Sequence, residues 1–393
     1  MKTDNHTGRL YYIDWLRFIG VLIVFCFHVS MIFVSWNWHI NNAESSFIMD
    51  TFVRFIHLWI MPMFFVLAGA SSEYSLHVRT EGDYIRERFK RLIVPIIIGV
   101  LFLIPPQIYL ERLSSAEFHG SYLQFYPHFF EGLYPGGNFT LNHIWFVLYL
   151  FVISIISLPL MKGLRRVRII EKYRREKAWI LFFLVAIVAI ESIFRIVWPV
   201  YLYPADLMIF LVYFTFGHYM ALDNTLRDII KKHSNSAFLI GVIFFIALTA
   251  FYYRTWIPAP GHSWKYVAFQ VFWSVTGWVW VVAILGLGMK KLNKRHVALG
   301  LVNEAVLPFY ILHQTVILVI AYYAVQWKAG IFMTFLFILT SAFLITFILY
   351  LVIRQFDVMR VLFGLKRKAD KTLKIERIPQ DAFLARLILW LSN

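Results

Sequence analysis

The sequence predicts an all-α integral membrane protein that crosses the bilayer about ten times. Of its 393 residues, 60% are hydrophobic, and the mean hydropathy is +0.67. Apolar runs of about 17–25 residues, long enough to cross a bilayer as a helix, recur along the chain. These values lie far from those of soluble globular proteins. We therefore expect one multi-pass membrane domain over residues 1–360 and no soluble domain of useful size.

The first predicted span has polar and aromatic residues at both ends and lacks a small-residue cleavage site, so we expect it to be a retained helix and not a signal peptide. The full set of predicted spans covers residues 16–35, 52–70, 92–110, 142–161, 178–198, 205–222, 237–253, 267–289, 306–326 and 330–353. A basic cytoplasmic tail, residues 361–393, follows the last span. Its final segment, 381–393, has apolar residues at helical spacing and is either an amphipathic helix on the inner leaflet or a frayed terminus.

Lys and Arg alternate between successive connections, and this alternation predicts the topology. The second connection holds five basic residues between 79 and 91, and the fourth holds eight between 162 and 177. The connections on the other side hold only Arg112, Arg254, Lys265 and Lys328. Because basic residues favour the cytoplasmic side, we expect both termini there, as an even number of spans requires. The formal charge of +16 then reflects topology and attraction to anionic lipid, without nucleic-acid binding.

The only cysteine, Cys26, lies within the first predicted span. A single cysteine excludes an intrachain disulfide and a cysteine-based zinc site. We expect no metal site and no redox chemistry in this chain.

Arg17 and His28 lie on one face of the first span. Eleven helical steps of about 100° turn both side chains in the same direction, about 16 Å apart along the axis. Ionisable groups are costly inside lipid and usually face a bundle interior or a wet cavity. An imidazole, with an ordinary pKa of about 6.5, suits general-base catalysis, so His28 is the candidate base. For a single intramembrane histidine, interhelical hydrogen bonding is the alternative.

Polar and aromatic residues follow the first span on the opposite side of the membrane. Aromatic faces mixed with amides and charged groups suit sugars, which stack on rings and need directed hydrogen bonds. An aromatic belt at the lipid interface is the alternative explanation for the tryptophans. The candidate acceptor-contacting residues here are Trp36, Trp38, His39, Asn41, Glu44, Arg54 and His57. The outward connection 111–141 is long enough to serve as a lid or binding loop.

Arg88 and Arg91 begin the third span from its basic side. Residues three apart are neighbours on a helix, so the pair can grip phosphates with bidentate hydrogen bonds. A basic cluster that only fixes orientation in the membrane is the alternative.

Arg17 and His28, with ten residues between them, resemble a signature of the acyltransferase 3 family of integral membrane acyltransferases, and Arg88 with Arg91 resemble its second arginine pair. Further segments resemble other motifs of this family: Met63–Gly69 its FF-x-x-SG segment, His143–Phe146 its H-x-WF segment, and Phe309–His313 its YxLH segment. The run from His28 to Glu44 is most similar to a succinyl-transferring branch that modifies periplasmic glucans. Ala68 departs from the family's serine, and Asp357 stands near a position where many members carry glutamate.

The resemblance implies that cytoplasmic acyl-CoA donates an acetyl or succinyl group, with Arg88 and Arg91 holding its phosphates and Arg17 holding another donor group or the acyl carbonyl. His28 would then deprotonate a hydroxyl of an extracytoplasmic or lipid-linked glycan, although a covalent acyl-histidine route is an alternative. The resemblance adds His143, Trp145 and His313 to the candidate substrate contacts, with structural hydrogen bonding as the alternative for both histidines. It implies no permanently bound cofactor and a multi-pass protein of a bacterial-type cell membrane.

A secondary transporter or a flippase for a saccharide is the competing hypothesis, because buried charges and histidines also build translocation pathways. Such proteins often show two similar halves with paired Gly/Pro-broken spans. The proline interruptions of this chain, Pro62, Pro95 and Pro105-Pro106, fall only in its early part. The sequence therefore favours the enzyme.

Overall fold

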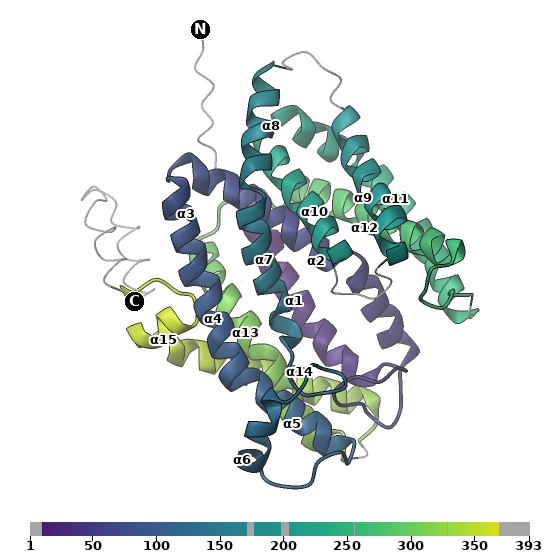
Figure 1. Cartoon of the computed structure of the whole chain (residues 1–393), viewed down its shortest axis with the longest axis vertical. Helices are drawn as coiled ribbons and strands as arrows, with labels where there is room; N and C mark the ends of the chain where they lie inside the picture. Colours follow the sequence, from purple (N-terminus) through teal and green to yellow (C-terminus); the bar gives the residue numbers. More distant parts are fainter. Residues whose placement is uncertain (1–9, 171–176, 198–203, 255, 328, 369–393) are drawn as a thin grey trace. The chain divides into compact units, whose positions relative to one another are not determined.

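A computed structural model describes residues 10–170, 177–197, 204–254, 256–327 and 329–368 (Figure 1). These residues form helices connected by loops and contain no β-strand, apart from an isolated bridge between Leu133 and Phe139. The predicted all-α class is therefore confirmed. The segment 381–393, predicted to be amphipathic or frayed, lies outside the described residues.

The chain divides into two compact units. Unit 1 contains residues 1–20, 54–84 and 152–295, and unit 2 contains residues 21–53, 85–151 and 296–393. Helices α1 (Tyr11–Ser30) and α2 (Phe47–His77) contribute to both units. The other helices of unit 1 are α8 (Leu158–Ile170), α9 (Lys177–Val197), α10 (Pro204–Leu222), α11 (Asn224–Tyr253) and α12 (Trp264–Lys291). Helix α3 (Glu81–Arg88) also has residues in both units.

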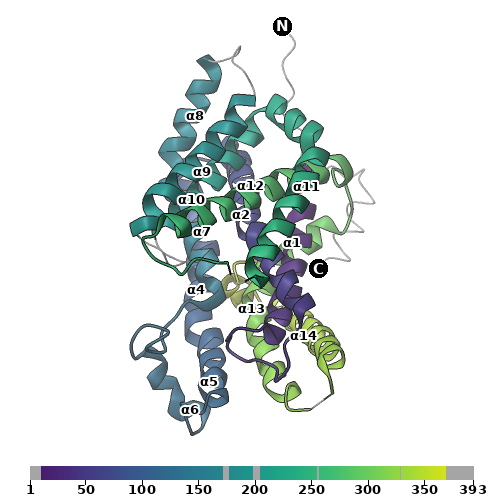
Figure 2. The ribbon, with the colours of Figure 1, turned by 90° about the vertical axis from the view of Figure 1, so that its right-hand side faces the viewer.

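Unit 2 combines long helices with several short turns. Its elements are η1 (Met31–Phe33), η2 (Phe89–Ile93), α4 (Val94–Ile98), η3 (Gly99–Leu103), α5 (Ile104–Ser114), α6 (Tyr122–Phe125), η4 (Tyr126–Phe130), η5 (Asn142–Ile144), α13 (Leu299–Ala324), α14 (Ile331–Ile353), α15 (Asp357–Leu362) and the first part of α7 (Trp145–Ile156), which ends in unit 1. Figure 2 shows α13 and α14 side by side, and α13 also packs on α5.

Eight helices in the described residues are long and apolar enough to cross a membrane. A ninth span results if α7 and α8, which meet at a 49° bend, count as one. The remaining predicted span, 178–198, is occupied by α9, whose apolar part, Ile180–Phe194, is shorter than a full span. Every predicted span thus corresponds to a helix, and the polytopic architecture is confirmed. The cytoplasmic position of the termini stays a prediction.

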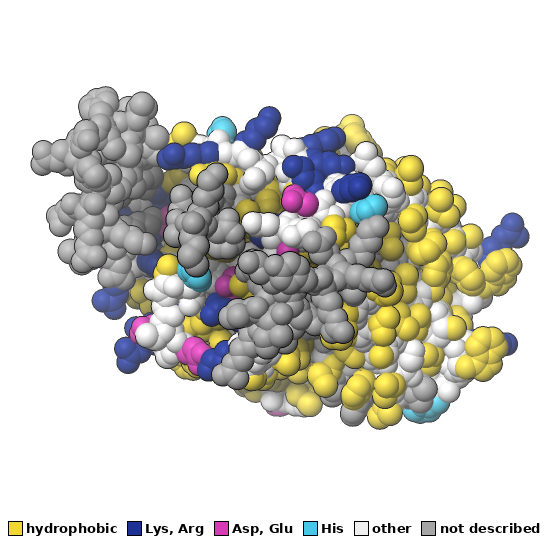
Figure 3. Space-filling model, turned by 90° about the horizontal axis from the view of Figure 1, so that it is seen from above, with side chains coloured by type: hydrophobic (Ala, Val, Ile, Leu, Met, Phe, Trp, Pro, Cys, Tyr) yellow, Lys and Arg dark blue, Asp and Glu magenta, His cyan; other side chains and the backbone are white. Residues whose placement is uncertain are grey.

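The surface is that of a protein built to contact lipid. Helices α11 and α14 expose most of their apolar side chains, as expected where lipid replaces water as the solvent. On the face shown in Figure 3, Lys and Arg side chains gather in the upper middle of the view, while hydrophobic side chains cover its right-hand part.

In unit 1, α2 and α10 approach closely at two glycines. A Cβ at Gly69 would overlap the carbonyl oxygen of Phe214, and a Cβ at Gly217 would overlap that of Val66. Small residues allow such close contact of membrane helices. Packing between helices therefore explains Gly69, the last residue of the segment Met63–Gly69.

The segment Glu81–Ser114, which belongs to unit 2 from residue 85 on, forms one long span that contains two π-helical turns, η2 and η3. Helix α15 packs on α4, and Arg360, only 2% exposed, pairs with Glu304 at 2.7 Å. The predicted cytoplasmic tail therefore begins with residues that pack into unit 2. Its separation from the membrane domain at residue 360 stays a prediction.

Candidate active site

Three histidines from distant parts of the chain lie together in unit 2. His28 comes from α1, His143 from η5 and His313 from α13, and each is at most 9% exposed. The ring centroids of His28 and His313 are 4.9 Å apart, those of His143 and His313 5.4 Å, and those of His28 and His143 6.5 Å. In the described part of the chain, no group of three or more His, Cys, Asp or Glu has the arrangement to hold a metal ion.

Hydrogen-bond partners assign the tautomers of His28 and His313, because a backbone carbonyl can only accept. His313 donates from Nδ1 to the carbonyl oxygen of Tyr310, so in the neutral ring its Nε2 carries the lone pair. His28 Nδ1 lies 3.0 Å from the carbonyl oxygen of Val24 and 3.0 Å from His313 Nε2. Both of these neighbours are acceptors, so His28 Nδ1 carries a hydrogen. The lone pair of neutral His28 is therefore on Nε2.

His28 Nε2 has no hydrogen-bond partner among the residues that the structure describes. The ring of Trp38, from the loop that follows η1, lies beside it with a centroid distance of 6.2 Å. A general base needs a lone pair that a substrate proton can reach, on a ring whose other nitrogen is fixed. His28 meets this requirement.

His143 connects η5 to α13. It donates from Nε2 to the carbonyl oxygen of Ile311 at 3.0 Å, and the Tyr310 hydroxyl donates to the carbonyl oxygen of His143. In the neutral ring the lone pair is then on Nδ1, which is buried and has no hydrogen-bond partner among the described residues. His143 therefore has a structural role at one nitrogen and an open acceptor at the other.

A second polar cluster surrounds His39. Its Nδ1 contacts Glu111 Oε2, and the side chains of this pair are 8% and 13% exposed. Its Nε2 lies 3.1 Å from Asn142 Oδ1. The cluster thus connects the loop after η1 with the end of α5 and with η5, next to His143.

The amides of this cluster show where the hydrogens of His39 lie. Gln107 Nε2 donates at 3.0 Å to a backbone carbonyl one turn earlier, which fixes its orientation. Gln107 Oε1 then accepts from Asn142 Nδ2 at 2.6 Å. Asn142 therefore presents its oxygen to His39 Nε2, which must donate. His39 Nδ1 faces the Glu111 carboxylate.

Several members of this cluster were not predicted from the sequence: Gln107, Glu111, Asn142, Gln314 and Thr315. A usable signal was present, because amides inside apolar spans are costly and usually functional. Gln107 precedes Glu111 by one helical turn, and Asn142 and Gln314 directly adjoin two predicted histidines.

Aromatic rings continue outward from His28. The centroid of Trp38 lies 5.2 Å from that of His39, which lies 6.3 Å from that of Tyr134. Tyr134 is 40% exposed and belongs to the predicted outward loop. Burial, followed by the negative charge of Glu111, raises the pKa of Tyr134 to about 12, so it is a neutral phenol at physiological pH. The line of rings thus joins the loop surface to His28.

Arg112 holds this loop in place. It donates to Asn138 Oδ1 at 2.9 Å and to two backbone carbonyls of the loop at 3.2 and 3.0 Å. Its guanidinium also lies over the Tyr134 ring at 5.7 Å. The connection 111–141, predicted to face outward, is therefore an ordered part of unit 2.

Asn41, Glu44 and Trp145, predicted to contact the glycan acceptor, also belong to unit 2. Asn41 accepts from the Trp38 backbone N–H at 2.8 Å and donates to the Trp36 carbonyl at 3.2 Å, so it shapes the turn that carries both tryptophans. The Glu44 side chain is exposed, and Trp145 packs on Tyr149 at the start of α7.

Arg54 and His57 belong to unit 1. The Arg54 guanidinium lies 4.0 Å from the ring centroid of Tyr252, and the ring of His57 lies 6.1 Å from that of Trp273. Their predicted position beside the acceptor stays a prediction.

The predicted donor-binding arginines lie on α1, on α3 and in η2. In unit 1, Arg17 donates to Ser71 Oγ at 2.6 Å. Ser71 lies on α2, about one turn after Ala68. In unit 2, Arg88 ends α3 and Arg91 lies in the π turn η2, 3.8 Å from Glu87. Residues three apart point in nearly the same direction in a regular α-helix. Because a π turn has more residues per turn, the angle between the Arg88 and Arg91 side chains differs from that value.

Asp357 is not part of the histidine cluster. Its side chain is exposed at the start of α15 and accepts from the Lys368 backbone N–H at 2.8 Å. Among the described residues, His313 and not a carboxylate supports His28.

Comparison with known proteins agrees with this architecture. A family model described as an acyltransferase domain, Acyl_transf_3, matches residues 10–353. Glucans biosynthesis protein C of Salmonella typhimurium is 25% identical over 385 residues, which cover 93% of this chain and 98% of that protein. The Escherichia coli protein of the same name is 25% identical over 383 residues, covering 92% and 97%. No solved structure gives a significant match. With a polytopic helical fold and a family match over most of its length, the chain belongs to the acyltransferase 3 family of membrane acyltransferases.

Proposed function

We propose that the protein is an O-acyltransferase that moves an acetyl or succinyl group from cytoplasmic acyl-CoA to a hydroxyl of an extracytoplasmic or lipid-linked glycan. The observation that carries this proposal is the open lone pair on His28 Nε2, which the hydrogen bond from Nδ1–H to His313 Nε2 fixes in place. The family match supports acyl transfer as the reaction class.

On this proposal, His28 Nε2 accepts the proton of the acceptor hydroxyl as its oxygen attacks the thioester carbonyl. A new C–O bond forms, and the C–S bond of the thioester breaks as the tetrahedral intermediate collapses. The imidazolium then returns its proton to the departing thiolate, so that CoA leaves as a thiol. Through this cycle the positive charge on His28 is stabilised by two acceptors at Nδ1, Val24 O and His313 Nε2.

A glycan acceptor is supported by the chemistry of the outer end of the site. Sugar rings stack on aromatic faces through their C–H groups, and the rings of Trp38, His39 and Tyr134 form such a line. The matched relatives are named for the biosynthesis of glucans, which points to the same acceptor class for this chain. Trp36, Asn41 and Glu44 flank this surface on the loop after η1.

On the donor side, Arg88 and Arg91 supply cations to the phosphates of acyl-CoA, and Arg17 holds a further donor group. Arginine binds phosphate through paired N–H donors. A multi-pass protein of the cell membrane, with its basic connections in the cytoplasm, presents these residues to cytoplasmic acyl-CoA.

The test is the ester content of surface and lipid-linked glycans from cells that carry the native protein or the His28→Ala variant. We expect the native protein to add acyl esters and His28→Ala to add none at equal expression. As a matched control, His233→Ala changes an exposed histidine of α11 and should preserve esterification. Equal ester content with the native and His28→Ala proteins would overturn the assignment of the base.

A reconstituted assay separates the enzyme from a transporter. Purified protein supplied with acyl-CoA and a glucan should release CoA thiol in proportion to the ester formed. Saccharide movement across proteoliposomes without thiol release would favour the transporter and contradict the proposal.

A further inference from the structure

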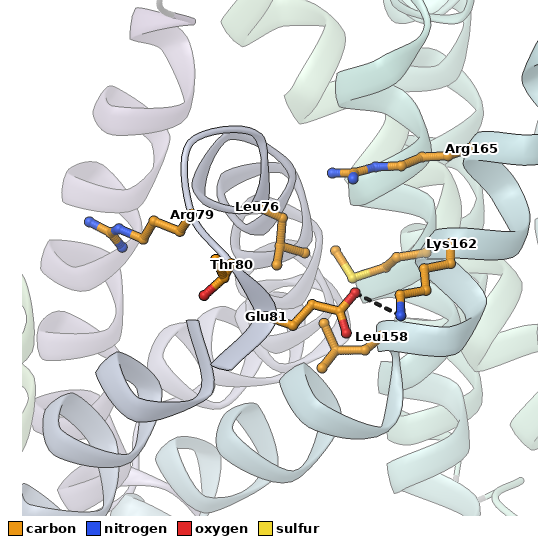
Figure 4. Close-up of a pocket in the computed structure, with 8 residues that line it drawn as sticks. Leu76, Arg79, Thr80, Glu81, Leu158, Lys162 and Arg165 are labelled. Atoms are coloured by element: carbon orange, nitrogen blue, oxygen red, sulfur yellow. Dashed lines mark ion pairs between the residues drawn. The ribbon is translucent and has the colours of Figure 1, made fainter. Parts of the chain in front are cut away.

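A cavity of about 290 Å³ lies in unit 1 between α8 and the turn that joins α2 to α3 (Figure 4). Its lining residues are Leu76, Arg79, Thr80, Glu81, Leu158, Met161, Lys162 and Arg165. Those from α8 occur at positions i, i+3, i+4 and i+7, which is one face of a helix. The site is therefore formed by a continuous helix face and not by scattered side chains.

The lining of this cavity combines charged and apolar side chains. Leu76, Leu158 and Met161 provide apolar walls, and Lys162 and Arg165 provide two cations beside a single lining carboxylate, Glu81. The Arg79 guanidinium points away from these two cations (Figure 4). A ligand that combines a phosphate with an apolar or ring-containing portion matches this lining. The volume is near the lower limit for ligand sites, so it suits one end of a larger molecule.

The cations are held in ways that leave room for an anion. Lys162 pairs with Glu81 at 2.8 Å, and both side chains are about half exposed, at 56% and 47%. Figure 4 shows this pair at the edge of the cavity, marked by the dashed line. An exposed pair of this kind is weak, so a phosphate with a charge of about −2 can displace the Glu81 carboxylate.

Arg165 is fixed by a buried partner. Its Nε and Nη2 both donate to Glu73 Oε2, at 3.1 and 2.7 Å, and the Glu73 side chain is 7% exposed. His218 Nδ1, fully buried, lies 3.0 Å from the same oxygen. One edge of the guanidinium is thus occupied, and Nη1 makes no hydrogen bond among the described residues. Because Glu73 fixes the Arg165 guanidinium through Nε and Nη2, Nη1 is well placed to donate to a ligand in the cavity.

Helix α2 joins this cavity to a predicted donor contact. Ser71, which accepts a hydrogen bond from Arg17, lies on α2 little more than one turn before Leu76. The cavity therefore lies at the same end of α2 as the arginine that the family resemblance links to the donor.

We propose that this cavity binds a phosphate ester and that Lys162 and Arg165 are its main ligands. Resting on the proposed function, the phosphate is that of the adenosine end of acyl-CoA, with the apolar wall against the adenine. The same chemistry is present in an anionic phospholipid headgroup, which is the other source of such a phosphate.

Kinetics with two acyl donors test whether the bound phosphate is that of acyl-CoA. Lys162→Ala should raise the KM for acyl-CoA about tenfold and leave the KM for acyl-pantetheine, which lacks the nucleotide, unchanged. Glu81→Gln removes the competing carboxylate and should lower the KM for acyl-CoA about threefold. Lys231→Ala, an exposed lysine of α11, is the matched control and should change neither value.

Binding without turnover separates this proposal from the proposed function. Adenosine 3′,5′-bisphosphate should raise the melting temperature of the native protein and have at least tenfold lower affinity for Lys162→Ala. If the bisphosphate does not bind, but phosphatidylglycerol vesicles stabilise the native protein more than Lys162→Ala, the phosphate comes from lipid. If Lys162→Ala and Glu81→Gln match the native protein with acyl-CoA, bisphosphate and vesicles, the site is refuted, even where acyl transfer itself is intact. Bisphosphate binding that depends on Lys162 supports the site even where no acyl transfer is found.

Discussion

His313 Nε2 lies 3.0 Å from His28 Nδ1, although the two residues are 285 positions apart in the sequence. The Nδ1 hydrogen of His313 goes to the Tyr310 carbonyl, so His313 can only accept from His28 while it is neutral. On the proposed function, this contact leaves the second nitrogen of His28 for the substrate. His313 would then be a positioning residue, in the role that a carboxylate has beside the general base of many enzymes.

Replacing His313 should affect catalysis more than binding. His313→Leu removes the acceptor that stabilises the His28 imidazolium, and we expect kcat to fall by about 10²-fold with little change in either KM. His313→Gln can present an amide oxygen to His28 Nδ1 and should recover part of this loss. Steady-state kinetics of the three proteins provides the measurement, and equal losses for Leu and Gln would contradict the positioning role.

The pair of His39 and Glu111 should stabilise unit 2. Because both side chains are largely buried, Glu111→Ala removes the partner of His39 Nδ1 and should lower the free energy of unfolding by about 3 kcal/mol. The double variant with His39→Leu should lose less than the sum of the single variants. Additive losses in a double-mutant cycle, followed by denaturant unfolding in detergent, would show that the pair is not coupled.

Tyr134 should contribute to acceptor binding through its ring. Tyr134→Ala should raise the KM for the glycan acceptor about two- to tenfold, since a stacked aromatic contact contributes about 0.5–1.5 kcal/mol. Tyr134→Phe keeps the ring and should keep most of the affinity, and the KM for the donor should not change. Leu133→Ala, at a neighbouring side chain that is 75% exposed, is the control. If both alanine variants raise the KM to a similar extent, the Tyr134 ring does not stack specifically on the acceptor.

The raised pKa of Tyr134 also predicts that the folding stability depends on alkaline pH. The pKa of Tyr134, about 12 in the folded protein, exceeds the unfolded value of about 10. The folded state then holds this proton more tightly, so the stability from the neutral phenol is complete below pH of about 10 and is lost as the pH rises towards 12. Native and Tyr134→Phe proteins should therefore have similar stabilities at neutral pH and diverge above pH of about 10. Parallel stability curves up to pH 12 would refute this linkage.

Close packing in unit 1 should be sensitive to one methyl group. Gly69→Ala places a Cβ against the Phe214 carbonyl and should destabilise the protein by about 1–3 kcal/mol. Gly82→Ala, in α3, meets no neighbouring atom within 4 Å and should not lower the melting temperature. Thermal unfolding in detergent measures both, and a tolerant Gly69 would show that α2 and α10 can separate.

The sequence by itself determined the helical class, the position of each span and the shared face of Arg17 and His28. These features depend on hydrophobic length and on the helical period, which are local properties of the chain. Each predicted span accordingly has a helix in the structure, including α9, where the apolar part is short.

Only the tertiary structure decided which groups meet. A helical period tells which face a histidine occupies but not which side chain lies opposite, so the contact of His28 with His313 could not be derived from spacing. The same holds for Glu111, which the sequence places at the end of a span and the fold places against His39. Two π turns in the third span also rotate its later side chains away from the directions that a regular α-helix would give them. Packing across distant segments, which no local period encodes, fixed the tautomer of His28 and with it the nitrogen proposed to act as the base.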